Sequence, residues 1–132
     1  MILKRLMFFR SIIRGEPTFS QNLPSKIWNL EKLKSLTLKM LRITEISPTI
    51  ENLTNLEILD LSNNKISQLP ETISNLKNLR ELNLIGNNFL ETFPEVITRM
   101  PYLKILKIDQ TQKERWNEAL QKLSKNLEIE VW

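Results

Sequence analysis

The chain of 132 residues contains no cysteine and no histidine. Disulfides, thiolate nucleophiles, histidine-containing catalytic pairs and ordinary zinc sites all need one of these side chains. We therefore expect no enzyme activity, no metal and no cofactor. The absence of cysteine fits a reducing compartment or a cysteine-poor secreted protein. We expect a cytoplasmic location, with secretion by a non-standard route as the alternative.

Long hydrophobic runs are also missing from the sequence. No apolar stretch approaches the roughly 20 residues that a membrane-spanning helix needs, so we expect no transmembrane segment. The longest unbroken apolar run near the N-terminus, Leu6 to Phe9, has four residues, and no small-residue cleavage site follows it. A secretory signal is therefore not expected either.

The net charge of +4 is concentrated at the N-terminus. Lys4, Arg5, Arg10 and Arg14 precede the first acidic residue, and the other 15 basic residues balance 15 acidic ones. A neutral body does not provide the basic face that nucleic acid requires. The alternative hypothesis is a peripheral membrane or nucleic-acid contact made by the basic, aromatic N-terminal segment. We favour a first strand there, formed by Phe9, Ile12 and their neighbours.

One stretch sets the pattern of the chain. From Leu56 to Leu76 the sequence reads LEILDLSNNKISQLPETISNL, which matches LxxLxLxxNxIxxLPxxIxxL. Leu33, Leu56 and Leu79 begin three such units and are equally spaced along the sequence. This pattern resembles the leucine-rich repeat of the short bacterial type, as found in proteins of spirochaete and enteric pathogens. The resemblance covers roughly residues 23–111.

Several positions depart from the pattern. Counting back one period from the second strand places a degenerate first strand around Arg10, Ile13 and Gly15. Leu41 occupies a slot where the resemblance implies an inward asparagine that bonds the backbone of adjacent coils; Asn64 and Asn87 keep that ladder residue. The third unit has one extra residue, which we place in the turn 85–88, where Gly86 can adopt a positive φ.

The C-terminal residues leave the repeat pattern. Thr111 and Glu114 have the spacing of a capping box. Trp116, Leu120 and Leu123 follow a helical period, which predicts a helix from about Gln112 to Lys125. Residues 127–132 alternate apolar and polar side chains, which predicts a strand parallel to the one at residues 106–108.

The predicted fold is an α/β, right-handed leucine-rich-repeat solenoid. Its parallel sheet lies on the concave face, and short helical turns, each begun by a proline at its first position, lie on the convex face. We expect a single domain, with a degenerate N-terminal cap (1–22), repeats (23–111) and a C-terminal cap of helix and strand (112–132).

The resemblance implies a non-enzymatic module that binds a protein or peptide. In the strand motif the leucines face the core, and the residues between them face outward. The sequence also allows a homodimer through the N-terminal end. The predicted partner-binding residues are Ser35, Thr37, Lys39, Ile58, Asp60, Ser62, Glu81, Asn83, Ile85, Ile105, Lys107 and Asp109, with Glu128 and Glu130 on the last strand.

Overall fold

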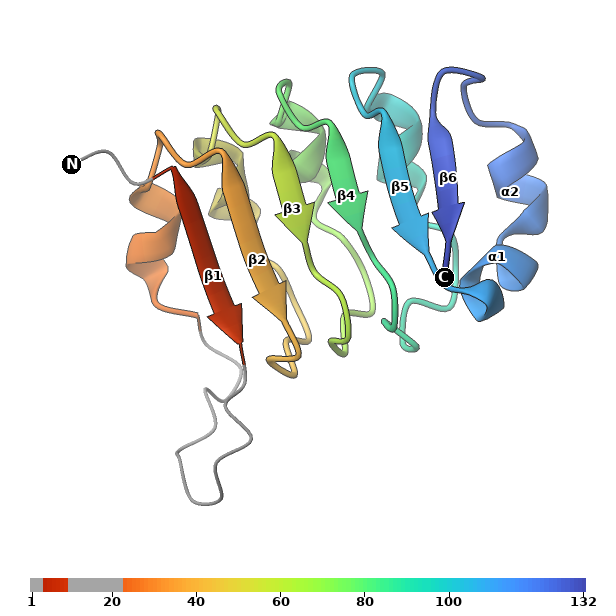
Figure 1. Ribbon diagram of the computed structural model, residues 1–132, viewed down its shortest axis with the longest axis horizontal. Coiled ribbons are helices and arrows are strands. Elements are labelled where there is room, and N and C mark those ends of the chain that lie inside the picture. Colours follow the sequence, from red (N-terminus) through yellow and green to blue (C-terminus); the bar gives the residue numbers. More distant parts are fainter. Residues whose placement is uncertain (1–3, 10–22) are drawn as a thin grey trace.

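The computed structural model describes residues 4–9 and 23–132. One sheet of six parallel strands runs through it in the order β1 to β6 (Figure 1). Because each strand pairs with the next one in the sequence, every connection is a crossover and the chain winds as a solenoid with an open sheet. The predicted fold class is confirmed. The strands are β1 Arg5–Phe9, β2 Ser35–Lys39, β3 Ile58–Asp60, β4 Glu81–Asn83, β5 Ile105–Ile108 and β6 Glu128–Val131.

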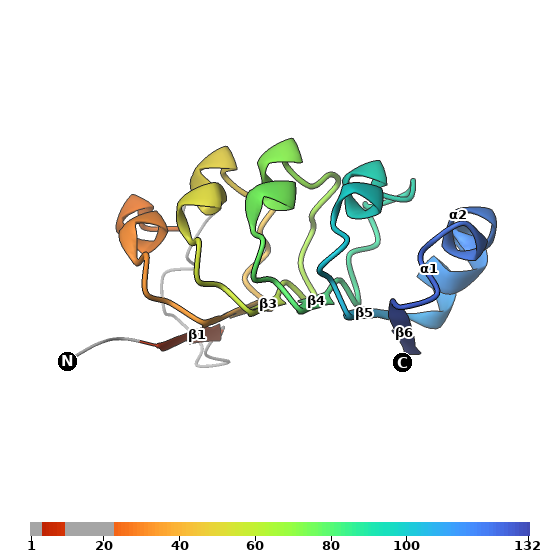
Figure 2. The same cartoon turned by 90° about the horizontal axis from the view of Figure 1, so that it is seen from above.

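Short 3₁₀ turns form the layer opposite the sheet (Figure 2). They are η1 Ser25–Asn29, η2 Pro48–Asn52, η3 Glu71–Asn75 and η4 Glu95–Arg99. The prediction that proline begins each turn was right only for Pro48. Pro24, Pro70 and Pro94 instead occupy the capping position before the turn. In η2 the capping position is occupied by Ser47, whose hydroxyl accepts a hydrogen bond from Thr49 N at 3.3 Å.

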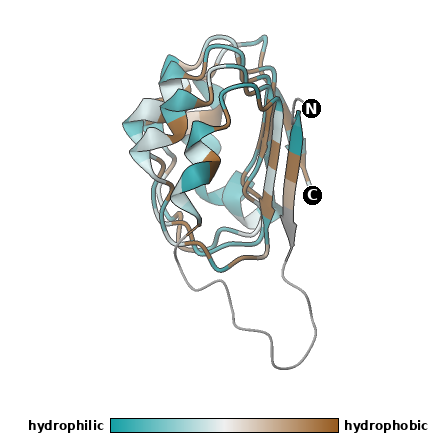
Figure 3. Cartoon of the chain, turned by 90° about the vertical axis from the view of Figure 1, so that its left-hand side faces the viewer, coloured by the Kyte–Doolittle hydropathy of each residue, from teal (hydrophilic) through white to brown (hydrophobic). Residues whose placement is uncertain are grey.

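The core lies between these two layers, as the view along the solenoid shows (Figure 3). Alternate strand residues point into it, and both leucines of each central strand motif, such as Leu59 and Leu61, are fully buried. Removing one such side chain from water contributes about 1.5–3 kcal/mol. Each coil therefore gains stability from its neighbours, and the predicted inward face of the strands is confirmed.

The first strand begins earlier than predicted. Arg5 of β1 pairs with Ser35, and Ser35 in turn pairs with Ile58, so the first coil contains more residues than the second. The strand beside β2 was predicted around Arg10, Ile13 and Gly15, which lie outside the described residues. Arg5–Phe9 occupies that place instead, because the prediction assumed coils of equal length. Phe9 belongs to β1, as expected, while Ile12 lies outside the described residues. Residues 5–9 form an extended strand of the sheet, so this part of the N-terminus is not a membrane-surface helix.

The strand-exit turns locate the extra residue of the third unit. Met40, Asn63 and Gly86 occupy equivalent positions in three successive coils, and all have positive φ angles, of 61°, 56° and 72°. The φ of Gly86 is therefore common to these coils and does not absorb the insertion, contrary to our prediction. Asn64 and Asn87 still follow the regular period, whereas the register from Glu81 to Ile105 is longer by one position. The insertion consequently follows Asn87.

The C-terminal cap differs from prediction at its start. Asp109, rather than Thr111, caps the helix, and its capping box is completed by Gln112. The predicted continuous helix is two short ones, α1 Gln110–Arg115 and α2 Asn117–Gln121, separated at Trp116. Trp116 is buried and meets the Phe93 ring edge-on, with centroids 5.8 Å apart. The predicted parallel strand β6 is confirmed.

Candidate binding face

Strand register brings the outward-facing side chains into two rows. The first row is Ser35, Ile58, Glu81, Ile105 and Glu128, one residue from each of β2 to β6. The second row is Thr37, Asp60, Asn83, Lys107 and Glu130. Neighbouring strands lie about 4.8 Å apart, so successive members of a row are adjacent. We call the eight outward residues of the last four strands the β3–β6 face: Ile58, Asp60, Glu81, Asn83, Ile105, Lys107, Glu128 and Glu130.

Apolar side chains also reach the outward side of the sheet. Ile58 is exposed, and so is Met7 of β1, which stands beside Thr37. Ile105 and Ile85 are half-buried. Ile58 and Ile105 belong to the same row and are separated by one strand. The sheet thus presents two isoleucines to the side opposite the 3₁₀ turns.

Lys107 is the only basic residue of the β3–β6 face, and neighbouring acids engage it. Its Nζ lies 2.6 Å from Glu81 Oε1 and 3.8 Å from Glu130 Oε2. The hydrogen bond to Glu81 raises the pKa of Lys107, so the ammonium stays charged at neutral pH. Four carboxylates and one ammonium leave the β3–β6 face acidic. Its electrostatic character is therefore opposite to the net charge of +4 of the whole chain.

Three of the predicted contact residues do not offer a free side chain. Thr37 and Ser62 are buried. Asp109 is committed to structure, because Oδ1 accepts from Gln112 N and Oδ2 accepts from Gly86 N, both at 2.9 Å. The alternation of residues along a strand predicts the direction in which a side chain points. It does not predict how deeply neighbouring residues bury that side chain, or whether the side chain caps a helix. The other predicted residues, Ser35 and Lys39 among them, lie half-buried or exposed on the strand side.

Residues 15–131 match the family model of a leucine-rich repeat region. The chain belongs to the leucine-rich-repeat family. A solved leucine-rich-repeat protein of Leptospira interrogans is 38% identical, with a TM-score of 0.69 over 83% of this chain. The resemblance to bacterial repeats is thereby confirmed. The match covers 28% of that protein, so this chain spans less than a third of its length. Comparison with curated proteins gives no match.

An asparagine ladder joins the leucine-rich repeats under the strand-exit turns. Asn64 Oδ1 accepts hydrogen bonds from Leu41 N at 2.9 Å and Ile43 N at 3.1 Å. Its Nδ2 donates to Leu38 O at 2.6 Å and Leu61 O at 2.9 Å. Buried backbone groups need such partners. Asn87 repeats the arrangement one coil later with Leu61 O, Leu84 O and Ile66 N. Both asparagines thus bond the backbone of adjacent coils.

Gln112 continues this ladder, which the sequence analysis missed. Its Nε2 donates to Leu84 O at 2.8 Å, as Asn87 does to Leu61 O, and its side chain is buried. Thr111 lies near the position that the repeat period gives for the next ladder residue, but its side chain is exposed. A glutamine is one methylene longer than an asparagine and reaches the carbonyl from the first turn of α1. The same residue therefore ends the ladder and caps the helix.

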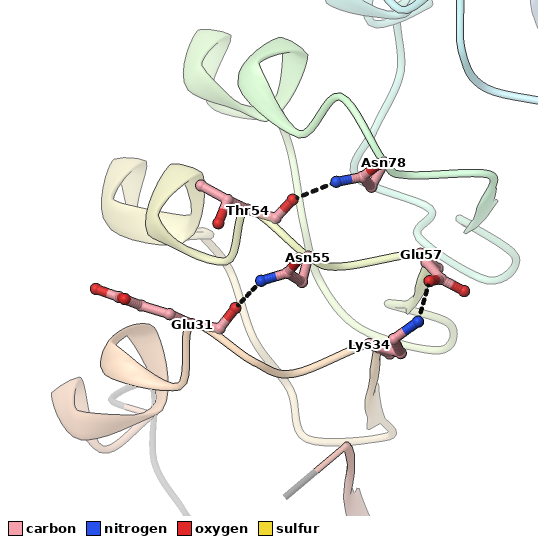
Figure 4. Close-up of polar contacts among 6 residues, drawn as sticks. All are labelled: Glu31, Lys34, Thr54, Asn55, Glu57 and Asn78. Atoms are coloured by element: carbon pink, nitrogen blue, oxygen red, sulfur yellow. Dashed lines mark hydrogen bonds and ion pairs between the residues drawn. The ribbon is translucent and has the colours of Figure 1, made fainter. Parts of the chain in front are cut away.

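A second asparagine row runs along the strand-entry side (Figure 4). Asn55 Nδ2 donates to Glu31 O and Asn78 Nδ2 donates to Thr54 O, both at 2.8 Å. Beside them Lys34 and Glu57 form an ion pair at 2.7 Å, which lowers the pKa of Glu57. Sequence reasoning missed this row, although Asn55 and Asn78 are visibly one repeat period apart in the sequence. It ties successive coils together at the edge opposite the ladder.

Residues 4–9 and 23–132 contain neither a metal-binding cluster nor a membrane-spanning helix. In that part of the chain, no acidic side chains gather into a group of three that could hold a metal ion. None of its helices has the length and apolar character needed to cross a membrane.

Proposed function

We propose that this leucine-rich-repeat domain is a non-enzymatic module that binds a protein or peptide on its strand face. Leucine-rich-repeat regions generally serve as interaction modules, and this supports the general assignment. The observation that supports the location is Ile58, which lies 39% exposed among polar neighbours in the middle of the sheet. A sheet surface that only faces water has no need of such a side chain, whereas a contact surface does.

The size of the face favours a narrow ligand. Six strands at about 4.8 Å spacing, with outward residues spanning roughly 10 Å of each strand, give a flat footprint near 240 Å². A standard protein interface buries about 800 Å² on each partner. An extended peptide or a single protruding loop therefore fits the strand face. A larger folded partner must also touch the strand-exit turns around Met40, Asn63 and Gly86.

Peptide selection tests this proposal. Random peptides displayed on phage are selected for binding to the immobilised protein. The binding of the selected peptides to a variant with Ile58→Asn and Ile105→Asn is then measured. Both replacements keep the charge and point outward, so we expect folding to persist while peptide binding is lost. The matched control, Phe89→Asn with Tyr102→Asn, removes two exposed aromatic side chains that lie outside the strands. Peptides that bind both variants equally would place the site elsewhere.

We also propose that the chain is a single domain, since one sheet contains all the described strands. We further propose that two copies associate through the N-terminal end. The position of β1 supports this association, because β1 is the outermost of the described strands on that side of the sheet. Lys4 O accepts from Ser35 N, so the backbone groups of Arg5 and Met7 point to the edge that no other described strand pairs with. An edge of this kind can pair with another strand.

A further inference from the structure

We infer that the ligand of the β3–β6 face is an extended peptide segment with two apolar residues three positions apart and basic residues flanking them. This inference rests on the proposed function and assigns it a ligand chemistry. Its first support is charge. The carboxylates of Asp60, Glu81, Glu128 and Glu130 outnumber the single ammonium of Lys107, which is already held by Glu81 and Glu130.

Two carboxylates remain placed for a ligand. Asp60 stands on the same strand as Ile58, and Glu128 stands on the strand next to Ile105. Glu128 is exposed, and the carboxylate of Asp60 uses Oδ1 to accept from Ser62 N at 2.9 Å, which leaves Oδ2. Glu128 thus follows Ile105 in the first row, whereas Asp60 lies beside Ile58 in the second row. Opposite charges placed across such a surface favour a ligand with cationic groups outside its apolar ones.

The spacing of the apolar pair supports an extended backbone. Ile58 and Ile105 lie in one row with β4 between them, so they are two strand spacings apart, which is about 9.6 Å. A polyproline II segment rises about 3.1 Å per residue and repeats its direction every third residue, at about 9.3 Å. Such a segment running across the strands returns an apolar side chain to each isoleucine. The residue beyond the Ile105 end then lies over Glu128, and a lysine beyond the Ile58 end lies over Ser35 and can extend its side chain along β3 to Asp60.

The two ends of the sheet differ in this respect. Arg5 of β1 and Lys39 of β2 are basic, whereas no acidic residue lies on the outward side of either strand. A basic ligand is consequently repelled from β1 and β2 and attracted to β3–β6. This polarity assigns the ligand to the β3–β6 face.

The test uses labelled Lys-Leu-Pro-Pro-Leu-Lys peptide with the full chain. Two matched peptides replace both lysines by glutamate or both leucines by serine. Because the whole protein carries a net charge of +4, non-specific attraction favours the glutamate peptide. The inference predicts the reverse order, with the lysine–leucine peptide bound most tightly by fluorescence anisotropy and its binding weakened by added salt.

Variants locate the contact. Glu128→Lys is expected to weaken binding of the lysine–leucine peptide about tenfold, equivalent to ~1.4 kcal/mol. Asp60→Asn, which keeps the acceptor for Ser62 N, is expected to weaken it less. Glu95→Lys on η4 changes the net charge equally on the opposite side of the molecule and should have no effect. An equal loss with Glu95→Lys would overturn the inference.

The remaining outcomes separate the ligand chemistry from the general function. Preferred binding of the glutamate peptide, lost in the Ile58→Asn, Ile105→Asn variant, would overturn the assigned chemistry and retain a peptide-binding face. Absence of binding by all three peptides would also overturn the assigned chemistry. The proposed function itself would then stand or fall on the displayed-peptide selection.

Discussion

Asn64 concentrates an unusual number of hydrogen bonds in one side chain. Its amide serves the backbone of two coils, and the side chain is buried, so water does not reach the groups that it satisfies. Leu41 occupies the same slot one coil earlier and can provide no such bonds. Asn64 therefore provides the ladder contact between the coils of β2 and β3, as Asn87 does between the coils of β3 and β4.

Asn64→Ala is expected to lower the free energy of unfolding by roughly 1–3 kcal/mol, because buried backbone donors and acceptors lose their partners. Urea denaturation followed by circular dichroism measures the change. Asn88→Ala provides the control, since Asn88 is exposed and its backbone carbonyl, which accepts from Arg115, is retained. An unchanged midpoint for Asn64→Ala would refute the importance of the ladder.

Met40 adopts a backbone conformation that suits another residue. Its φ is 61°, and the equivalent positions in the next two coils carry Asn63 and Gly86. Left-handed backbone costs a residue such as methionine roughly 1–2 kcal/mol, while asparagine tolerates it better. Met40→Asn is therefore expected to raise the free energy of unfolding by several tenths of a kcal/mol. The side chain is exposed, so little packing is lost. A decrease in the thermal midpoint would contradict this account.

At the scale of elements, the leucine period predicted the repeat strands and their buried face. Because the same leucine spacing recurs in each coil, the strand assigned in one repeat supports the strand assigned in the next. Leu59, Leu82 and Leu106 are all buried, as expected. The binding-face rows followed from the same alternation, although the burial of Thr37 and Ser62 did not. Their depth depends on side chains from neighbouring strands and turns, which one strand's pattern does not contain.

The elements at both ends were harder to predict because they do not repeat. The first coil has a longer period, so counting back from β2 reached the wrong residues. At the other end, the prediction used Thr111 with Glu114, whereas the structure forms the capping box with Asp109 and Gln112. The deciding contacts join Asp109 to Gly86 N and Gln112 to Leu84 O. These contacts with the preceding coil are tertiary and lie outside the local sequence.

Substitution at the start of α1 tests this assignment. Asp109→Ala removes the cap and the acceptor of Gly86 N, and we expect a loss of about 1–2 kcal/mol in unfolding free energy. Thr111→Ala removes an exposed side chain and should change it by less than about 0.5 kcal/mol. The two variants are compared by thermal unfolding. A larger effect for Thr111→Ala would restore the capping position that the sequence first indicated.

At the scale of the whole molecule, β1 and β6 are the edge strands among the described residues, and the two edges differ in chemistry. Two copies of β6 paired antiparallel about Ile129 would set Glu128 opposite Glu130 of the second copy, and like charges placed opposite each other are destabilising. Two copies of β1 paired about Met7 would set Arg5 opposite Phe9 of the second copy, without such repulsion. Acidic residues thus protect one edge from self-association, and the other edge lacks that protection.

We therefore expect the protein to dimerise through β1 as its concentration rises, with light scattering reporting the increase in mass. Met7→Lys places a charge at the centre of the paired edge and should keep the protein monomeric. Met40→Lys adds the same charge to a methionine of similar exposure, 44% against 41%, in a turn away from that edge, and should dimerise like the wild type. A wild-type protein that stays monomeric at every concentration would contradict the β1 dimer. Equal disruption by the two lysines would show that net charge, rather than the edge, controls association.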